Sequence, residues 1–117
     1  MARVSRAQSK QAADVSYDLR AKYFRALGDP TRLRILELLI EGPLTVSEIV
    51  DILRCPQSTV SNHLACLRWC GFVDSKSEGR WVTYSVTDTQ LKKIVALGRG
   101  LVAKRAELVA ACTRIAP

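Results

Sequence analysis

The chain has 117 residues, which is enough for one hydrophobic core but too few for two ordinary domains. Its 18 Lys and Arg residues exceed its 11 Asp and Glu residues, so its net charge is +7. This basic balance favours a polyanionic partner, with nucleic acid as the first candidate, although charge alone leaves open a protein that is merely basic. No apolar run approaches the roughly 20 residues that span a bilayer, and the N-terminus lacks the apolar core of a signal peptide, so we expect no membrane partner and a cytoplasmic location.

The N-terminal part of the chain predicts a loose segment followed by a helix. Residues 1–11 are polar and basic, and we expect them to be flexible. Residues 12–27 carry apolar side chains at every fourth position from Val15 to Leu27, which predicts an amphipathic helix.

A second helix is predicted to begin at Pro30. Gly28 can stop the preceding helix, Asp29 can cap the new one, and proline suits the first helical position. Gly42 and Pro43 then end it, because proline cannot continue a helix.

Two further helices are separated by a tight break. Thr45 followed three residues later by Glu48 fits a capping box and predicts a short helix over 46–53, and Pro56 breaks the chain before a helix over 57–71. The polar start of this last helix is rich in Ser, Thr, Asn and Gln, which makes the pair typical of a helix-turn-helix. We expect its apolar side chains and its thiols to face inward, namely Val60, Leu64, Cys66, Leu67 and Cys70.

Beyond Gly71 the periodicity changes to two, which predicts a β-hairpin. A polar tip over 75–80, with Gly79 in the turn, precedes the aromatic and β-branched residues of 81–86. A hairpin directly after a helix-turn-helix is a wing, and Lys76 and Arg80 at its tip suit phosphate contact.

A long closing helix is predicted from Gln90 to about Cys112, capped by Thr87 or Asp88. Its apolar residues are too many for one small domain to cover, which favours dimerisation through the first and last helices; the alternative is a helix that packs only on its own core. We therefore expect a mainly α winged helix-turn-helix with a β-hairpin wing, in which residues 12–117 form the DNA-binding and dimerisation domain.

The candidates for DNA contact lie mainly on the predicted recognition helix. Side chains near the start of such a helix reach base edges, while backbone amides there favour phosphate. The base-reading candidates are Gln57, Ser58, Thr59, Asn62 and His63, and weaker phosphate candidates are Ser61 and Arg68. A polar helix face that only contacts solvent is the alternative.

Two cysteines stand four residues apart on the same predicted helix. Residues at this spacing are neighbours, so Cys66 and Cys70 could converge on one ion, and a third thiolate would complete an all-sulfur site that selects soft metals such as Hg, Cd or Pb. The alternative is two buried packing thiols. Cys55 lies about 16 Å along the helix axis from Cys66 and is left out of the site, and His63 is a less favoured ligand.

Four stretches resemble the ArsR/SmtB family of bacterial winged-helix repressors. They are residues 26–36 (ALGDPTRLRIL), 58–67 (STVSNHLACL), 71–73 (GFV) and 78–88 (EGRWVTYSVTD). Within that family, the Cys-x-x-x-Cys of residues 63–71 is similar to CmtR-like cadmium and lead sensors and to actinobacterial mercury-responsive members.

This resemblance implies a metal site formed by two thiols of the recognition helix and a third from the C-terminal region of the other subunit. Cys66 and Cys70 match the pair, and Cys112 is the candidate for the third ligand. Residues 45–53 lack the paired cysteines of the family's thiol-rich arsenic and cadmium sites. The last helix has no His, so the resemblance disfavours zinc, nickel or cobalt.

The sequence therefore predicts a homodimeric repressor that binds double-stranded operator DNA when metal-free and is released by a soft divalent metal ion. One alternative is a thiol redox or persulfide sensor of the same fold, and another is a thiol metal-binding protein without a DNA function. We expect no enzyme, because the sequence shows no paired acid–base carboxylates, Gly-rich phosphate loop or nucleophile-and-base motif.

Overall fold

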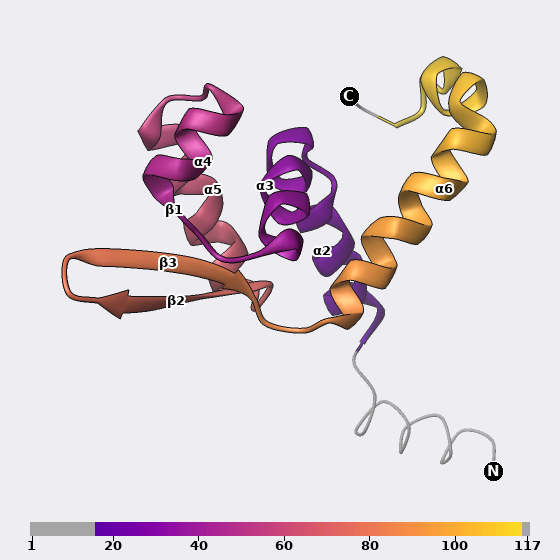
Figure 1. Ribbon diagram of the computed structural model, residues 1–117. Helices are drawn as coiled ribbons and strands as arrows, with labels where there is room; N and C mark the ends of the chain where they lie inside the picture. Colours follow the sequence, from indigo (N-terminus) through magenta and orange to yellow (C-terminus); the bar gives the residue numbers. More distant parts are fainter. Residues whose placement is uncertain (1–15, 116–117) are drawn as a thin grey trace, which may run out of the picture.

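The computed structural model describes residues 16–115. Its elements are α2 (Tyr17–Leu27), α3 (Pro30–Glu41), β1 (Leu44–Thr45), α4 (Val46–Leu53), α5 (Gln57–Trp69), β2 (Val73–Glu78), β3 (Trp81–Val86) and α6 (Gln90–Ala111), shown in Figure 1. This order confirms the mainly helical fold with a β-hairpin wing. The predicted flexible segment, residues 1–11, and positions 12–15 of the first predicted helix lie outside the described residues.

The caps predicted for α3 and α4 are present, whereas the prediction for α6 was wrong: its cap position is Thr89, which makes no side-chain cap, and Asp88, one residue earlier, accepts from the amide of Gln90 at 2.8 Å. Asp29 accepts the backbone hydrogen of Arg32 at 3.0 Å, and Pro30 occupies the first position of α3. At α4, the hydroxyl of Thr45 accepts from the amide of Glu48 at 3.2 Å, and the Glu48 carboxylate accepts from the amide of Thr45 at 2.9 Å. Each cap satisfies backbone donors that a helix N-terminus leaves unpaired.

The helix-turn-helix is formed by α4 and α5. Arg54, with φ 58°, adopts the left-handed conformation that ends α4, and Pro56 precedes α5. Gly71 terminates α5 as predicted, since at φ 82° it follows the C-cap residue Cys70 and turns the chain into β2. The prediction that both thiols face inward was wrong for Cys70, which is exposed at the end of the helix.

The wing is part of a three-stranded antiparallel sheet in the order β1-β3-β2. The two-residue strand β1 was not predicted, since two residues are too few to show alternation. In the hairpin, Glu78 pairs with Trp81, and Gly79 at φ 62° allows a turn of only two residues between them. The predicted tip over 75–80 was therefore too long: Lys76 lies within β2 opposite Thr83, and only Arg80 of the two basic residues lies in the turn.

Helices and sheet share one hydrophobic core. Its buried residues come from α2 to α6 and from the strand that follows α5: Ala26, Leu27, Ile35, Leu36, Leu39, Ile49, Leu53, Val60, Leu64, Leu67, Phe72, Val73 and Leu91. The ring of Tyr23 lies 4.3 Å from that of Phe72, so the end of α2 packs beside the exit of α5. This contact places α2, α3 and α5 at a common junction.

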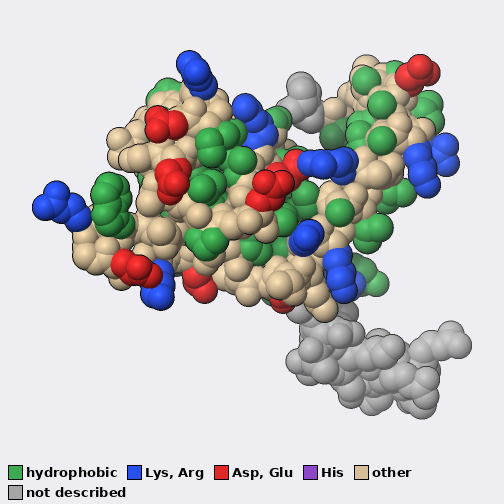
Figure 2. Space-filling view, in the orientation of Figure 1, with side chains coloured by type: hydrophobic (Ala, Val, Ile, Leu, Met, Phe, Trp, Pro, Cys, Tyr) green, Lys and Arg blue, Asp and Glu red, His purple; other side chains and the backbone are tan. Residues whose placement is uncertain are grey.

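Helix α6 leaves the core after its first turns. Of its residues only Leu91 is buried, whereas Leu97 and Leu101 are 67% and 63% exposed, which confirms that the domain leaves much of the apolar surface of this helix uncovered. Figure 1 shows the helix projecting away from α3, and Figure 2 shows hydrophobic side chains along it. An ion pair between Arg99 and Glu37 joins it to α3, and its backbone is kinked at Arg105.

Across residues 16–115, the structure contains no helix with the length and apolar character needed to cross a lipid bilayer.

Candidate nucleic-acid interface and thiol pair

The predicted base-reading residues lie on the first two turns of α5. Gln57, Ser58 and Asn62 are exposed, and Thr59 is half-buried. No side chain caps this end of the helix, because Pro56 occupies the cap position. The free amides of the first turn and the polar side chains therefore form one surface that can donate hydrogen bonds to phosphate and to base edges.

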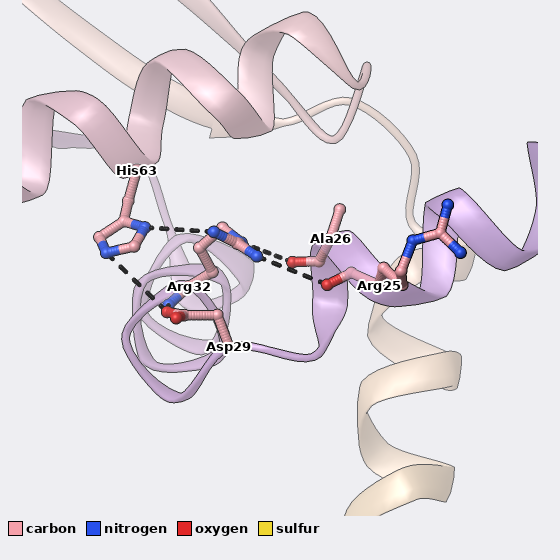
Figure 3. Close-up of polar contacts among 5 residues, drawn as sticks. All are labelled: Arg25, Ala26, Asp29, Arg32 and His63. Atoms are coloured by element: carbon pink, nitrogen blue, oxygen red, sulfur yellow. Dashed lines mark hydrogen bonds and ion pairs between the residues drawn. The ribbon is translucent and has the colours of Figure 1, made fainter. Parts of the chain in front are cut away.

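His63 is placed differently from the other candidates. Its side chain is only 21% exposed, and its imidazole lies against α3, with Nδ1 3.5 Å from Arg32 Nη1 and Nε2 3.9 Å from Asp29 Oδ2 (Figure 3). The amide hydrogen donated by Arg32 lowers the pKa of the Asp29 carboxyl, and the charges of His63 and Arg32 lower it further, against a partial opposing effect of burial. Asp29 is therefore an anion at neutral pH, facing the recognition helix.

The phosphate candidates occupy two places. Arg80 is exposed in the wing turn, and Figure 2 shows a basic side chain at the far end of the hairpin. Lys76 is also exposed, but its Nζ lies 3.3 Å from a carboxylate oxygen of Glu78, which partly neutralises it. Basic residues at the wing can contact the DNA backbone beside the groove that α5 enters.

The remaining candidates, Ser61 and Arg68, line one cleft between α5 and the wing. Trp69 and Tyr84 complete its wall, together with Ala65. Neither Trp69 nor Tyr84 was predicted from the sequence. Tyr84 reaches the cleft because it pairs with Ser75 of β2, the strand that contacts α5, and this pairing cannot be read from α5 alone.

Cys66 and Cys70 lie one helical turn apart, with the amide of Cys70 donating to the carbonyl of Cys66 at 3.0 Å. Cys66 is half-buried and Cys70 is exposed. Burial raises the pKa of the Cys70 thiol, as does the neighbouring Cys66, while the positive charges of Lys22 and Arg32 act in the opposite direction. Lys22 of α2 and Arg32 of α3 are therefore close enough to Cys70 for their charges to act on it.

The two sulfur atoms of Cys66 and Cys70 suit a soft metal ion but supply only some of the ligands that such an ion needs. Two adjacent sulfur atoms, one reachable from solvent, can bind an ion that prefers thiolates. Within residues 16–115, however, no three His, Cys, Asp or Glu side chains of one subunit come close enough to hold a metal. The pair is thus an open half-site.

The other two cysteines lie apart from the pair. Cys112 is the exposed C-cap of α6, beyond the kink at Arg105, so one subunit does not bring it to the thiols of α5. Cys55 lies in the break between α4 and α5, packs against the core, and has its sulfur 3.7 Å from the carbonyl of Leu53. This environment is that of a packing residue.

Comparison with known proteins places this architecture among bacterial regulators. Residues 29–75 match the family described as "Bacterial regulatory protein, arsR family". The chain is 42% identical over 98 residues to a probable mercury resistance operon repressor of Streptomyces lividans, a match that covers 84% of this chain and 78% of that protein. It is 46% identical over 78 residues to the HTH-type transcriptional regulator CmtR of Mycobacterium tuberculosis, covering 67% of this chain and 64% of CmtR.

A solved structure has the same fold. The homodimeric winged helix-turn-helix DNA-binding domain (fragment 1–100) of Mb0332 from Mycobacterium bovis, a possible ArsR-family transcriptional regulator, superposes with a TM-score of 0.70 at 28% identity. The superposition covers 80% of this chain and 85% of that one. The helix-turn-helix, the wing and the flanking helices are thus a recurrent arrangement in which a homodimer is known.

Proposed function

The chain belongs to the arsR family of bacterial regulatory proteins, and from this premise we propose that it is a transcriptional repressor that binds operator DNA as a homodimer and is released by a soft metal ion. The effector would be Cd²⁺, Pb²⁺ or Hg²⁺ held by Cys66 and Cys70. One observation carries the proposal: the thiol pair lies on the same helix that presents the exposed polar surface to DNA.

DNA recognition follows from the shape and polarity of α5 and the wing. An exposed helix with an uncapped N-terminus and short polar side chains fits the major groove, and the wing supplies Arg80 for a phosphate alongside. A two-fold symmetric dimer would present two such helices to half-sites about one helical turn of DNA apart.

The uncovered apolar side chains support a homodimer formed by the first and last helices. On α2 they are Tyr17, Leu19 and Phe24, and on α6 they are Ile94, Leu97, Leu101, Val102, Leu108 and Val109. Exposed apolar surface of this extent on a small domain is typical of a protein interface, and self-association buries the same patch on both copies. The similar Mb0332 domain is homodimeric, which supports self-association of this chain as well.

The metal site is proposed to be completed across this dimer. The pair on α5 lacks a third sulfur, and Cys112 is exposed at the end of α6 and free to meet the pair of a second copy. A bound ion would supply positive charge and strong sulfur bonds. It requires both thiols to be deprotonated, so the raised pKa of Cys70 makes binding weaker as the pH falls.

Repression and metal sensing are linked by thermodynamic necessity. If metal lowers operator affinity by some factor, operator DNA must lower metal affinity by the same factor, typically 5- to 150-fold. Cys70 ends α5 two residues before Phe72, whose ring packs on Tyr23 of α2, so an ion bound at the thiols favours whichever setting of α5 suits its sulfur ligands.

The experiment is a footprint of the reduced, metal-free protein on the DNA upstream of its own coding sequence. We expect a protected site with two-fold symmetry that is lost on adding Cd²⁺, Pb²⁺ or Hg²⁺ but is retained with Mg²⁺. Protection that persists at stoichiometric amounts of all three soft ions contradicts metal sensing. The absence of any specific protection contradicts the repressor itself and favours a thiol metal-binding protein.

A thiol redox or persulfide sensor of the same fold is the second candidate. It is favoured by the exposure of Cys70 directly beside Cys66, which makes the pair accessible to oxidants. In that case a mild oxidant or a persulfide donor releases the operator without metal, and a thiol reductant restores binding.

A further inference from the structure

Arg32 joins the consecutive helices α2 and α3 to α5, where its contact His63 lies 31 residues further along the chain. It lies in the first turn of α3, where its Nε donates to the carbonyl of Ala26 at 2.6 Å and its Nη2 donates to the carbonyl of Arg25 at 3.4 Å. Its Nη1 lies 3.5 Å from His63 Nδ1 on α5. Figure 3 shows this single guanidinium between the end of α2 and the recognition helix.

A guanidinium has no hydrogen-bond acceptor, so Arg32 can only donate in its contacts. The other ring nitrogen of His63, Nε2, lies 3.9 Å from Asp29 Oδ2, and the same oxygen accepts the backbone hydrogen of Arg32. Asp29, Arg32 and His63 thus form a closed set of contacts, which we call the α3 clamp.

The α3 clamp lies between the two surfaces that the proposed function must connect. On one side are the last carbonyls of α2, a helix of the proposed dimer surface. On the other side is α5, where His63 directly follows the candidate base-reading residue Asn62 and precedes Cys66 by three residues. Residues three apart on a helix share a face, so the clamp and the thiol pair act on the same side of α5.

We propose that Arg32 is a positioning residue for operator recognition, which sets the orientation of α5 against α2 through His63, and that an ion at the thiol pair alters DNA binding through this clamp. The inference rests on the proposed function. It also assigns His63 a role in positioning α5, in place of the base contact expected from its place on the helix.

Arginine is required at this position by geometry. One planar guanidinium reaches two carbonyl groups and an imidazole at once, whereas the single ammonium of lysine cannot span all three. At His63, asparagine offers an amide oxygen in place of Nδ1, and alanine offers no acceptor. The chain therefore provides one disruptive and one conservative variant at His63, together with a charge-preserving variant at Arg32.

The test measures the affinity of Arg32→Lys, His63→Ala and His63→Asn for the footprinted operator and for unrelated DNA, with the folded fraction checked by circular dichroism. Arg34→Lys, the same change on an exposed position of α3, is the matched control. We expect Arg32→Lys and His63→Ala to lose about tenfold or more in operator affinity, comparable to one good base contact, with little change on unrelated DNA. Arg34→Lys should match the wild type, and His63→Asn should recover most of the loss.

A double-mutant cycle separates positioning from direct contact. If Arg32 and His63 act as one clamp, the double variant Arg32→Lys/His63→Ala loses no more affinity than either single variant. Additive losses, or operator affinities equal to wild type, overturn the inference. Should Arg32→Lys fail to fold, equal affinities of His63→Ala and His63→Asn overturn it instead.

The same variants test the link to the thiols. In the wild type, Cd²⁺ should lower operator affinity, and the ratio of the affinities without and with Cd²⁺ measures the coupling. We expect this factor to fall toward one in Arg32→Lys and His63→Ala. Both variants should still bind Cd²⁺. An undiminished factor in both variants overturns the second half of the proposal. A wild type that has no operator, or that ignores Pb²⁺ and Hg²⁺ as well as Cd²⁺, contradicts the proposed function, and this result is seen before any variant is made.

Discussion

The imidazole of His63 lies 3.9 Å from the carboxylate of Asp29, whose same oxygen accepts the backbone hydrogen that caps α3. One side chain therefore both starts a helix of the core and faces the helix proposed to read DNA. These two tasks can be separated by mutation, since capping requires only an acceptor and the attraction to His63 and Arg32 requires a charge.

Replacing Asp29 tests the cap. Asp29→Ala should lower the free energy of unfolding by about 1 kcal/mol, because the first turn of α3 loses its side-chain acceptor, whereas Asp29→Asn should lose little. Urea denaturation of the three proteins measures the difference. Equal losses in both variants would show that charge, and not capping, is the dominant contribution of Asp29.

The charge of Asp29 should contribute to stability in a way that depends on pH. The pKa of Asp29 is lowered in the folded state, chiefly by the Arg32 amide, so its stabilisation is present above the unfolded pKa of about 3.9 and is lost as the pH falls through the folded pKa. Wild type should therefore lose more stability than Asp29→Asn between about pH 7 and about pH 3, by a small amount because the side chain is partly exposed. Parallel pH profiles would contradict this assignment.

The wing predicts unequal effects for its two basic residues. Arg80→Ala should lower the affinity of the protein for operator DNA and for unrelated DNA alike, since it removes one phosphate contact. For the same reason, the slope of log affinity against log salt concentration should fall in magnitude by about one per subunit. Lys76→Ala should have a smaller effect, because Glu78 already neutralises part of that charge. Titrations at several salt concentrations measure both, with Lys104→Ala on α6 as the control. A larger effect at Lys76 than at Arg80 would contradict the placement of the turn.

The apolar surface of α6 predicts the oligomeric state. Leu101→Asp places a charge in the middle of the exposed stripe, so we expect a monomer by sedimentation and a large loss of operator affinity, because two half-sites are no longer bound together. Ile52→Asp, a similar change at a 52% exposed position of α4, should leave the dimer intact. A wild type that sediments as a monomer at all concentrations would reject the dimer and, with it, a metal site shared between subunits.

Serine substitutions distinguish the cysteines that bind metal from those that only pack. Cys66→Ser and Cys70→Ser should each bind operator as wild type does and fail to respond to Cd²⁺, because a hydroxyl is a poor ligand for a soft ion. Cys112→Ser should weaken the metal response without affecting DNA binding, and Cys55→Ser, which changes a packing thiol, should leave the response unchanged. If both α5 variants lose operator binding, the pair has a packing role.

Much of the fold could be predicted from local pattern. The capping box of Thr45 and Glu48, the Asp29–Pro30 start and the positive-φ position at Gly79 each fix a boundary through chemistry that lies within a few residues. The boundaries that were missed depend on the rest of the fold. The short strand β1 exists only because β3 pairs with it, and the hairpin turn is only two residues long because β2 and β3 pair as far as Glu78 and Trp81.

The candidate site shows the same division. Exposure of the polar start of α5 follows from its sequence, and so does the spacing of the two thiols. The contacts of His63 do not, since Arg32 is 31 residues away and reaches it only after α3 packs against α5. The sequence of α5 carries no local sign that this side chain faces α3, and the base contact predicted for His63 remains a prediction.

In the proposed mechanism the metal and the operator compete through one helix, and a single titration distinguishes this competition from independent binding. Reduced, metal-free protein bound to fluorescently labelled operator is titrated with Cd²⁺ while sulfur-to-metal absorption and DNA anisotropy are recorded together. Both signals should change in step and saturate at the same stoichiometry, and neither should change in Cys66→Ser. Thiolate absorption that saturates while the operator stays fully bound would contradict competition between metal and DNA.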